Sequence, residues 1–294
     1  VMYEALAGEL PFKGKSVFAI IRQHMETPPP PLMAKAPDLN PLLASESGRE
    51  PGFRELVARA LEITPDALST WDAMCHDAQP AALVGLEQAF VSSPRLDNLG
   101  SCFSALTGLR ERLDAPRAAH HVAALVFFDH EEVGSTSARG AQGSFLRDVL
   151  ERGILARGGT REDYHRAIAD SVCLSADMAH ATHPNYPEKH DPEHPVRLNG
   201  GPVIKTNTNQ RYASEGETEA VFLEACAAAG VPCQRYSHRN DMPYGTTIGP
   251  LAAAALGMRT VDVGSPMLAM HSVRELAGTR DAWAMARAMA AFLT

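Results

Sequence analysis

Four acidic residues and one histidine stand out in this chain because each lies where an expected strand gives way to a turn. Carboxylate oxygens and an imidazole are donors that zinc accepts in hydrolases, and separate strand ends can bring them to one point. Irregular spacing along the chain is therefore compatible with a single two-metal site. The candidates are Asp97, Glu131, Glu132, Asp177 and His271.

The adjacent pair Glu131–Glu132 suits a division of labour in such a site. A two-metal centre needs a shared carboxylate, terminal ligands, and one carboxylate that accepts a proton from water instead of binding metal. Adjacent residues at a strand end point in different directions, so one glutamate can bind metal while the other faces the water. A solvated turn is the simpler explanation for any one of these acids alone. The apolar strand expected over 121–129 favours function, because ligands bind beyond the carboxyl ends of strands in covered sheets.

The elements that must position these residues alternate between helix and strand. Capping boxes of Thr160 with Asp163 and of Ser214 with Glu217 begin two helices, and Gly230 ends the second. This alternation predicts an α/β fold with helices on both sheet faces. Apolar periodicity predicts helices over 53–63, 96–114, 144–155, 161–170, 247–257 and 279–293, and strands over 121–129, 171–177, 231–238 and 259–264.

Composition indicates a globular enzyme. The 294 residues are 45% hydrophobic, enough for one large domain or two smaller ones. The net charge of −8, without a basic patch, argues against a nucleic-acid surface. Five scattered cysteines without a CxxC pair predict neither a disulfide framework nor a thiolate metal site. With no secretory signal or long apolar span, we expect a cytoplasmic protein without membrane partners.

Six long stretches of the chain match a known family. They are DAQPAALVGLEQAFVSSPRLDN, FFDHEEVGSTSARGAQGSFL, SADMAHATHPNYPEKHDPEHP, NGGPVIKTNTNQRYASEG, RNDMPYGTTIGP and DVGSPMLAMHSVRE. Through these stretches the chain resembles, from about residue 38 to its last residue, the aspartyl aminopeptidase family of dinuclear zinc metallopeptidases. The resemblance implies a zinc-peptidase-like mixed sheet with helices on both faces, two zinc ions, peptide substrates with an N-terminal Asp or Glu, and a homo-oligomer.

The resemblance also implies a role for each candidate. Asp97 would bridge the two metals, and Glu131 would be the catalytic base. Further metal ligands would be Glu132, Asp177 and His271.

The VIKTNTNQRY stretch would line the substrate pocket. By the same resemblance, Lys205 would pair with an acidic substrate side chain, and Tyr212 would stabilise the oxyanion. On residue type alone Lys205 would be a solvated lysine of a surface strand, since lysine is usually exposed.

Two departures from the family pattern shape the expected domains. The family's first metal-ligand histidine, in an HTDSP-type motif, is missing from this chain, so one metal site would lack a ligand and activity would be impaired. The inserted dimerisation domain is also mostly missing. We therefore expect a linker and remnant of that domain over 37–70, and a metallo-aminopeptidase catalytic domain without its N-terminal part over 71–294. The alternative is a catalytically silent remnant that acts as a binding or assembly subunit.

Residues 1–36 resemble a different family. The stretch VMYEALAGELPFKGKSVFAIIRQHMETPPPPL is similar to the late C-lobe of a bacterial serine/threonine kinase, and we expect a short helical fragment there. The glycine-rich loop, the HRD-type loop and the DFG motif of a kinase are missing from the sequence, so kinase activity is not expected. Both a genuine fusion and an error of gene prediction would explain the fragment.

Overall fold

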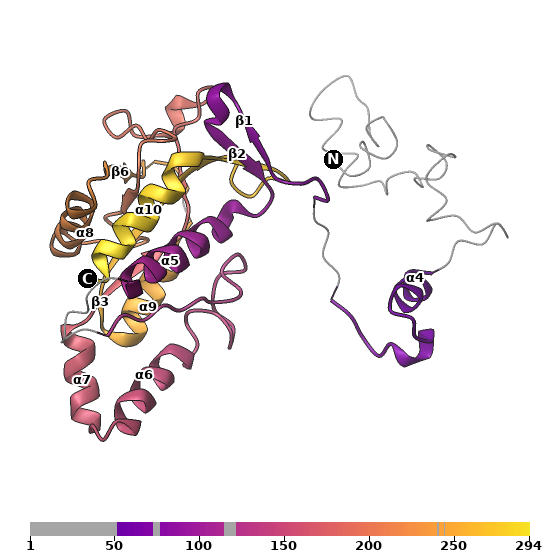
Figure 1. The fold of residues 1–294 in the computed structure, drawn as a ribbon, viewed down its shortest axis with the longest axis horizontal. Helices are drawn as coiled ribbons and strands as arrows, with labels where there is room; N and C mark the ends of the chain where they lie inside the picture. Colours follow the sequence, from indigo (N-terminus) through magenta and orange to yellow (C-terminus); the bar gives the residue numbers. More distant parts are fainter. Residues whose placement is uncertain (1–51, 73–76, 115–121, 240, 244) are drawn as a thin grey trace. The chain divides into compact units, whose positions relative to one another are not determined.

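The structure is a computed structural model that describes residues 52–72, 77–114, 122–239, 241–243 and 245–294 (Figure 1). The chain divides into two compact units, with the boundary between Cys75 and His76. The kinase-like fragment expected over 1–36 lies outside the described residues.

In its described residues, 52–72, the first unit has one short helix, α4 (Phe53–Ala60), and one turn of 3-10 helix, η1 (Pro65–Ala67). The helix is shorter than the expected 53–63, because Glu62 adopts a left-handed conformation with φ 57° and turns the chain. Contacts of the Arg54 side chain stabilise this turn. Its guanidinium donates to the carbonyl oxygens of Pro65 and Leu68 and lies 5.0 Å from the centre of the Trp71 ring.

The second unit is built on two mixed sheets, so the predicted α/β class with a mixed sheet is confirmed. The five-stranded sheet has the order β1–β2–β9–β8–β4 and the four-stranded sheet the order β3–β7–β5–β6. Their strands are β1 (Ala82–Val84), β2 (Phe90–Ser93), β3 (Val172–Ala176), β4 (Ala179–His180), β5 (Val203–Thr206), β6 (Gln234–Ser237), β7 (Arg259–Gly264), β8 (Pro266–Leu268) and β9 (Glu275–Gly278).

Helices cover both faces of the four-stranded sheet, as predicted. Val261 and Val263 of β7 point toward one face, where they form the main core with Phe222 and Met285. Asp262 points to the other face, toward α9, where Thr247 donates to it. The helices of this unit are α5 (Leu96–Asp114), α6 (Phe145–Ala156), α7 (Arg161–Asp170), α8 (Gly216–Ala229), α9 (Ile248–Leu256) and α10 (Thr279–Phe292).

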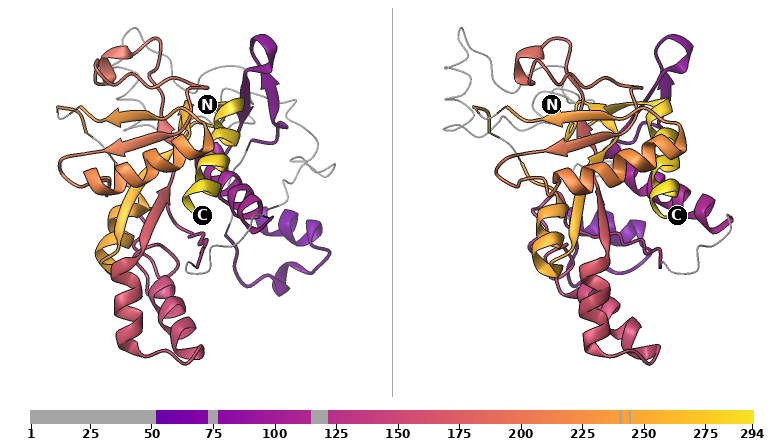
Figure 2. Two further views of the ribbon diagram at one scale, coloured as in Figure 1. Left: turned by 60° about the vertical axis from the view of Figure 1, so that its left-hand side comes forward. Right: turned by 90° about the vertical axis from the view of Figure 1, so that its left-hand side faces the viewer.

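The helices α5 and α10 lie side by side, as Figures 1 and 2 both show. Their close approach depends on small residues: a Cβ on Gly108 would lie 2.7 Å from the backbone oxygen of Ala286. The predicted bounds of α5, α6, α7, α9 and α10 differ from the observed ones by a single residue at most. No helix of the described residues is long and apolar enough to span a lipid bilayer.

The strand predicted over 121–129 is wrong. Residues 122–129 form no strand and pair with no described strand, and Val122 is 94% exposed. An apolar run forms a strand only where a neighbouring edge accepts its backbone N–H and C=O groups. Both sheets are completed by other strands, including short ones that the sequence pattern did not reveal, and this segment remains outside them.

One of the two predicted capping boxes is confirmed and the other is corrected. Thr160 and Asp163 cap α7 reciprocally, with N···O distances of 3.2 Å and 2.8 Å. The box of α8 forms one residue later than expected, from Glu215 and Thr218. Ser214 is unavailable as a cap because its buried hydroxyl accepts the backbone N–H of Asp262 at 2.9 Å. Gly230 ends α8 as predicted, at φ 64°.

Candidate metal centre

The chain passes from the four-stranded sheet to the five-stranded sheet at Asp177, one of the candidate residues. Asp177 lies between β3 and β4, and its backbone N–H donates to the oxygen of Val263 at 3.1 Å. A Cβ on Gly264 would lie 2.0 Å from the backbone oxygen of Asp177. Only glycine permits this approach, so Gly264 fixes where Asp177 stands at the junction of the two sheets.

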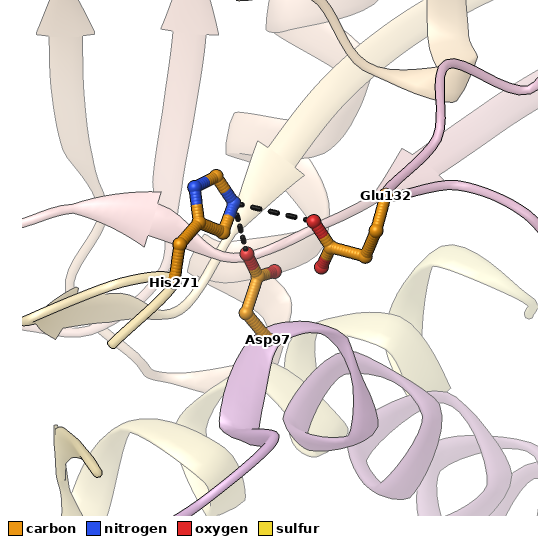
Figure 3. A group of neighbouring side chains, drawn as sticks. All are labelled: Asp97, Glu132 and His271. Carbon is orange, nitrogen blue, oxygen red and sulfur yellow. Dashed lines mark ion pairs between the residues drawn. The ribbon is translucent and has the colours of Figure 1, made fainter. Parts of the chain in front are cut away.

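Three side chains from separate parts of the chain meet at one point (Figure 3). Asp97 comes from the first turn of α5, His271 from the β8–β9 turn, and Glu132 from the turn after 122–129. The Nε2 atom of His271 is 3.1 Å from Asp97 Oδ2 and 3.3 Å from Glu132 Oε2. Neighbouring ligands of a tetrahedral zinc ion, with bonds of about 2.1 Å, lie about 3.4 Å apart. Both distances from His271 are therefore close to that spacing, and all three ligand atoms lie within 4.8 Å of one another.

The chemistry of Asp97 fits a metal ligand as well as its position does. Its side chain is 5% exposed, and its Oδ1 atom has no hydrogen-bond partner among the described residues. Burial, with the charge and hydrogen bonding of Asp177 and the charges of Glu132 and Glu275, raises the pKa of Asp97 to about 9. A buried carboxylate oxygen without a donor, among other carboxylates, is stabilised by a cation.

The triad opens onto solvent. The side chains of His271 and Glu132 are 64% and 51% exposed. They border an open pocket of about 430 Å³, whose lining residues are Arg95, Asp97, Glu132, His271, Ser272 and Glu275. A substrate can therefore reach the three ligand atoms.

The two adjacent glutamates have different surroundings. Glu132 faces His271, whereas Glu131 responds to the charges of Asp177 and Lys205. Burial, then repulsion by Asp177 and Glu132, raises the pKa of Glu131 to about 7, against an opposing effect of Lys205. A carboxyl group with this pKa can accept and return a proton near neutral pH.

The turn that holds the glutamates is fixed by His130. The backbone N–H of Ser135 donates to the oxygen of His130 at 2.9 Å, and the His130 ring is hydrogen-bonded through Nδ1 to the Ser137 hydroxyl at 2.6 Å. His130 therefore shapes the turn and does not belong to the group of donor atoms.

Asp177 lies with Lys205 and Tyr212 rather than in the triad. The ammonium of Lys205 donates to the backbone oxygens of Asp177 and Met178 at 3.2 Å and 3.1 Å, and lies 3.6 Å from Asp177 Oδ2. The reading of Lys205 as a solvated surface lysine is wrong, because the residue is 2% exposed. The ammonium of Lys205 lies over the Tyr212 ring, 5.4 Å from its centre. Burial raises the pKa of the Tyr212 hydroxyl.

Sequence reasoning missed two buried acids that organise this region. Glu275 accepts the backbone N–H of Asp97 at 3.0 Å and that of His271 at 2.8 Å. Asp262 accepts hydrogen bonds from the hydroxyls of Ser175 and Thr247 and from the backbone N–H of Ala213. A signal for Asp262 was present, since a single acid in an apolar strand must be paired when the strand is buried. No comparable signal marks Glu275.

Three other histidines, His180, His190 and His238, lie around Tyr236 and not in the triad. The rings of His180 and His190 lie 6.4 Å and 5.7 Å from that of Tyr236, and the tyrosine hydroxyl is hydrogen-bonded to His238 Nδ1 at 2.5 Å. Among the described residues, the one group of three metal-binding side chains whose donor atoms all lie within 4.8 Å of one another is Asp97, Glu132 and His271.

Comparisons with known proteins point in the same direction as this geometry. A protein-family model described as "Aminopeptidase I zinc metalloprotease (M18)" matches residues 34–293. The "Probable M18 family aminopeptidase 2" of Mycobacterium tuberculosis (strain ATCC 25618 / H37Rv) is 52% identical over 223 residues, which are 74% of this chain and 52% of the relative. The chain thus spans about half the length of the curated relatives that it matches.

Solved structures agree with the sequence comparison. A chain of the cryo-EM structure of the Ape4 and Nbr1 complex is 41% identical with a TM-score of 0.71, over 74% of this chain and 42% of that chain. The mApe1 dodecamer from S. cerevisiae is 27% identical with a TM-score of 0.68, over 85% of this chain and 56% of that chain.

Proposed function

Because the chain belongs to the aminopeptidase I zinc metalloprotease (M18) family, we propose that it hydrolyses the first peptide bond of peptides that begin with Asp or Glu. The observation that carries the proposal is the convergence of Asp97, Glu132 and His271 at ligand spacing, with the raised-pKa carboxyl of Glu131 adjacent in sequence. Family membership supports the reaction type, and the residues around Lys205 support the substrate class.

The proposed zinc ligands are those of the triad, and Asp97 is the ligand shared with a second ion. Asp177 is the further ligand of that second ion, which would have no third protein ligand among the described residues. Zinc bound there would polarise the scissile carbonyl and lower the pKa of water.

The proton transfer is assigned to Glu131. Its carboxylate accepts a proton from the attacking water and returns it to the leaving amine, for which a pKa near 7 is suited. The hydroxyl of Tyr212, beside Asp177 and Lys205, donates to the developing oxyanion.

Selection of an acidic first residue is assigned to Lys205. Its ammonium has the Asp177 carboxylate as its charged partner in the structure. When Asp177 instead binds a zinc ion, its carboxylate no longer neutralises Lys205. The positive charge of Lys205 then becomes available to a substrate carboxylate. A point charge of this kind favours an acidic side chain without demanding bidentate geometry.

One observation favours a second candidate function, a catalytically silent subunit that binds one metal. The described residues contain a single three-donor group, whereas a zinc site usually needs three protein ligands and a water. Such a chain would keep the fold and act in binding or assembly.

The experiment that separates the two is an assay of the purified chain with added zinc or manganese on Asp-, Glu-, Leu- and Ala-chromogenic substrates. Turnover led by Asp or Glu, and abolished in Glu131→Gln, supports the peptidase. Turnover led by Leu would refute the acidic specificity. No turnover in a folded protein with one bound zinc would support the silent subunit.

The proposal also covers the domain bounds, the cellular location and the oligomeric state of the chain. We place the catalytic domain at 71–294 and the dimerisation-domain remnant at 37–70, and we assign no catalytic role to the kinase-like residues 1–36. The four described cysteines are unpaired, which suits a reducing cytoplasm. Assembly into a homo-oligomer is supported by the dodecamer of a relative.

A further inference from the structure

Both carboxylate oxygens of Glu275 are occupied by backbone donors from residues of the triad. Oε2 accepts the N–H of Asp97 at 3.0 Å, and Oε1 accepts the N–H of His271 at 2.8 Å. The residue is 3% exposed, so water does not compete for these bonds. One side chain therefore joins the first turn of α5 to the β8–β9 turn, which are far apart in the sequence.

We propose that Glu275 is the positioning residue of the metal centre. Its hydrogen bonds to the backbones of Asp97 and His271, which together we call the clamp, hold the two ligand side chains at the spacing of zinc ligands before any metal binds. The inference rests on the metal site proposed above. Because Glu275 bonds to the two backbones, both side chains stay free to bind the ion. Their donor atoms lie 3.1 Å apart in the clamped arrangement.

The place of Glu275 in the fold suits a rigid clamp. It begins β9, where it lies opposite Ser93 of β2, the strand that leads directly to Asp97. The next residue along, Leu276, pairs with Leu268 of β8, which precedes the turn that carries His271. The sheet thus holds Glu275 between the two turns that it bonds, and a side chain fixed by a sheet positions more precisely than one on a loop.

The conformation of the His271 backbone explains why a clamp is needed. His271 has φ 63°, a left-handed conformation that is uncommon for a residue with a Cβ. Such a conformation persists where surrounding contacts hold it. The charge-assisted hydrogen bond from its N–H to Glu275 is a contact of this kind, and it stabilises the turn that aims the imidazole at Asp97.

A matched control is available in Asp281. This acid is also fully buried, and its two oxygens also accept two backbone N–H groups, those of Asn199 at 2.6 Å and Gly201 at 2.9 Å. Neither donor belongs to the triad. Asp281→Asn therefore reproduces the loss of a buried double acceptor without touching the metal centre.

The test measures zinc affinity by competition with a chromophoric chelator, for the full chain and for Glu275→Gln, Glu275→Ala and Asp281→Asn. We expect zinc to bind about 10- to 100-fold more weakly to Glu275→Gln, as for other residues that orient metal ligands. The loss should be larger for Glu275→Ala, which keeps no acceptor. Asp281→Asn should lose thermal stability and keep its zinc affinity. Unchanged zinc affinity in folded Glu275→Gln would overturn the proposal.

A second measurement needs no variant to fold. Hydrogen exchange of the zinc-free wild-type chain should show protected amides at both Asp97 and His271, because the clamp precedes the metal. Free exchange at both amides in a folded chain would overturn the proposal. Tight zinc binding with a working clamp but no peptide hydrolysis would instead refute the proposed function and leave the clamp standing.

Discussion

The ammonium of Lys205 lies 3.6 Å from a carboxylate oxygen of Asp177 and donates to the backbone oxygen of the same residue at 3.2 Å. Asp177 lies between β3 and β4, and Lys205 lies in β5. The side chain of Lys205 is buried. A buried charge is tolerated where partners satisfy it, and the loss of one partner leaves the other uncompensated. This pair therefore links the stability of the fold to the proposed recognition of acidic substrates.

Lys205→Met should destabilise the zinc-free protein by about 3–5 kcal/mol, because it leaves Asp177 without its buried cation. Added zinc should restore part of this loss, since a metal ion can replace the missing positive charge beside Asp177. Denaturant unfolding with and without zinc measures both effects. The exposed Lys189 is the control, because Lys189→Met should change stability by about 0.5 kcal/mol or less. Equal effects of the two substitutions would contradict the role of the pair.

Glu131→Gln should remove the proton acceptor and leave the metal ligands in place. In a chain with peptidase activity, we expect a loss of about a hundredfold or more in kcat, the usual scale for a positioned acid–base group. Zinc content, measured by atomic absorption, should be unchanged. Glu132→Gln is the comparison, because Glu132 faces His271 and its loss should weaken zinc binding. Loss of zinc from Glu131→Gln but not from Glu132→Gln would reverse the two assignments.

The second zinc ion should bind much more weakly than the first. Asp97, Glu132 and His271 complete a three-donor group, whereas Asp97 and Asp177 give a neighbouring ion only two protein ligands. Dialysis against metal-free buffer, followed by zinc analysis, should leave one ion per chain. Two ions retained after dialysis would contradict this prediction, and it would point to a ligand outside the described residues.

The zinc-free protein should lose stability as the pH rises. Burial raises the pKa of Asp97 to about 9 and that of Glu131 to about 7, so the folded state holds these protons more tightly than the unfolded state. Their stabilising contribution is full at acidic pH, and it is lost as the pH rises through 7 for Glu131 and through 9 for Asp97. Bound zinc reverses the trend, because deprotonated ligands bind it better.

Thermal unfolding from about pH 5 to pH 9, with a chelator or with zinc, checks this dependence. The Tm of the chelated wild type should fall across the range. Asp97→Asn should flatten that fall, since an amide does not titrate. A chelated Tm that stays constant in the wild type would contradict the prediction.

Gly264→Ala should disrupt the junction of the two sheets. The added Cβ would lie 2.0 Å from the backbone oxygen of Asp177, and backbone cannot move aside as a flexible side chain can. We expect destabilisation by about 1–3 kcal/mol or more, together with weaker metal binding at Asp177. Gly153 is the control, because it lies within α6 with nothing near its added Cβ. Gly153→Ala should stabilise the protein by about 0.5–1 kcal/mol, and equal effects at both glycines would contradict the argument.

The sequence by itself determined most of the helix bounds and the types of residue at the candidate site. Thr160 and Asp163 cap α7, and Gly230 ends α8, because capping depends on neighbours within one turn of the chain. The apolar period of α5 and α10 likewise depends only on residues a few positions apart. The carboxylates and the histidine were candidates because only a few side chains can bind zinc, and the family resemblance gave each its expected role.

Only the tertiary structure decided which of these residues meet. The apolar run 122–129 has strand composition, but strand formation depends on a partner edge that is set by the rest of the chain. Ser214 lost its capping role to Asp262, which lies 48 residues away along the chain. Lys205 is buried beside Asp177, and Glu275 bonds both to the nearby His271 and to Asp97, which lies 178 residues away. Hydrogen bonds between distant segments leave no periodic trace in the sequence.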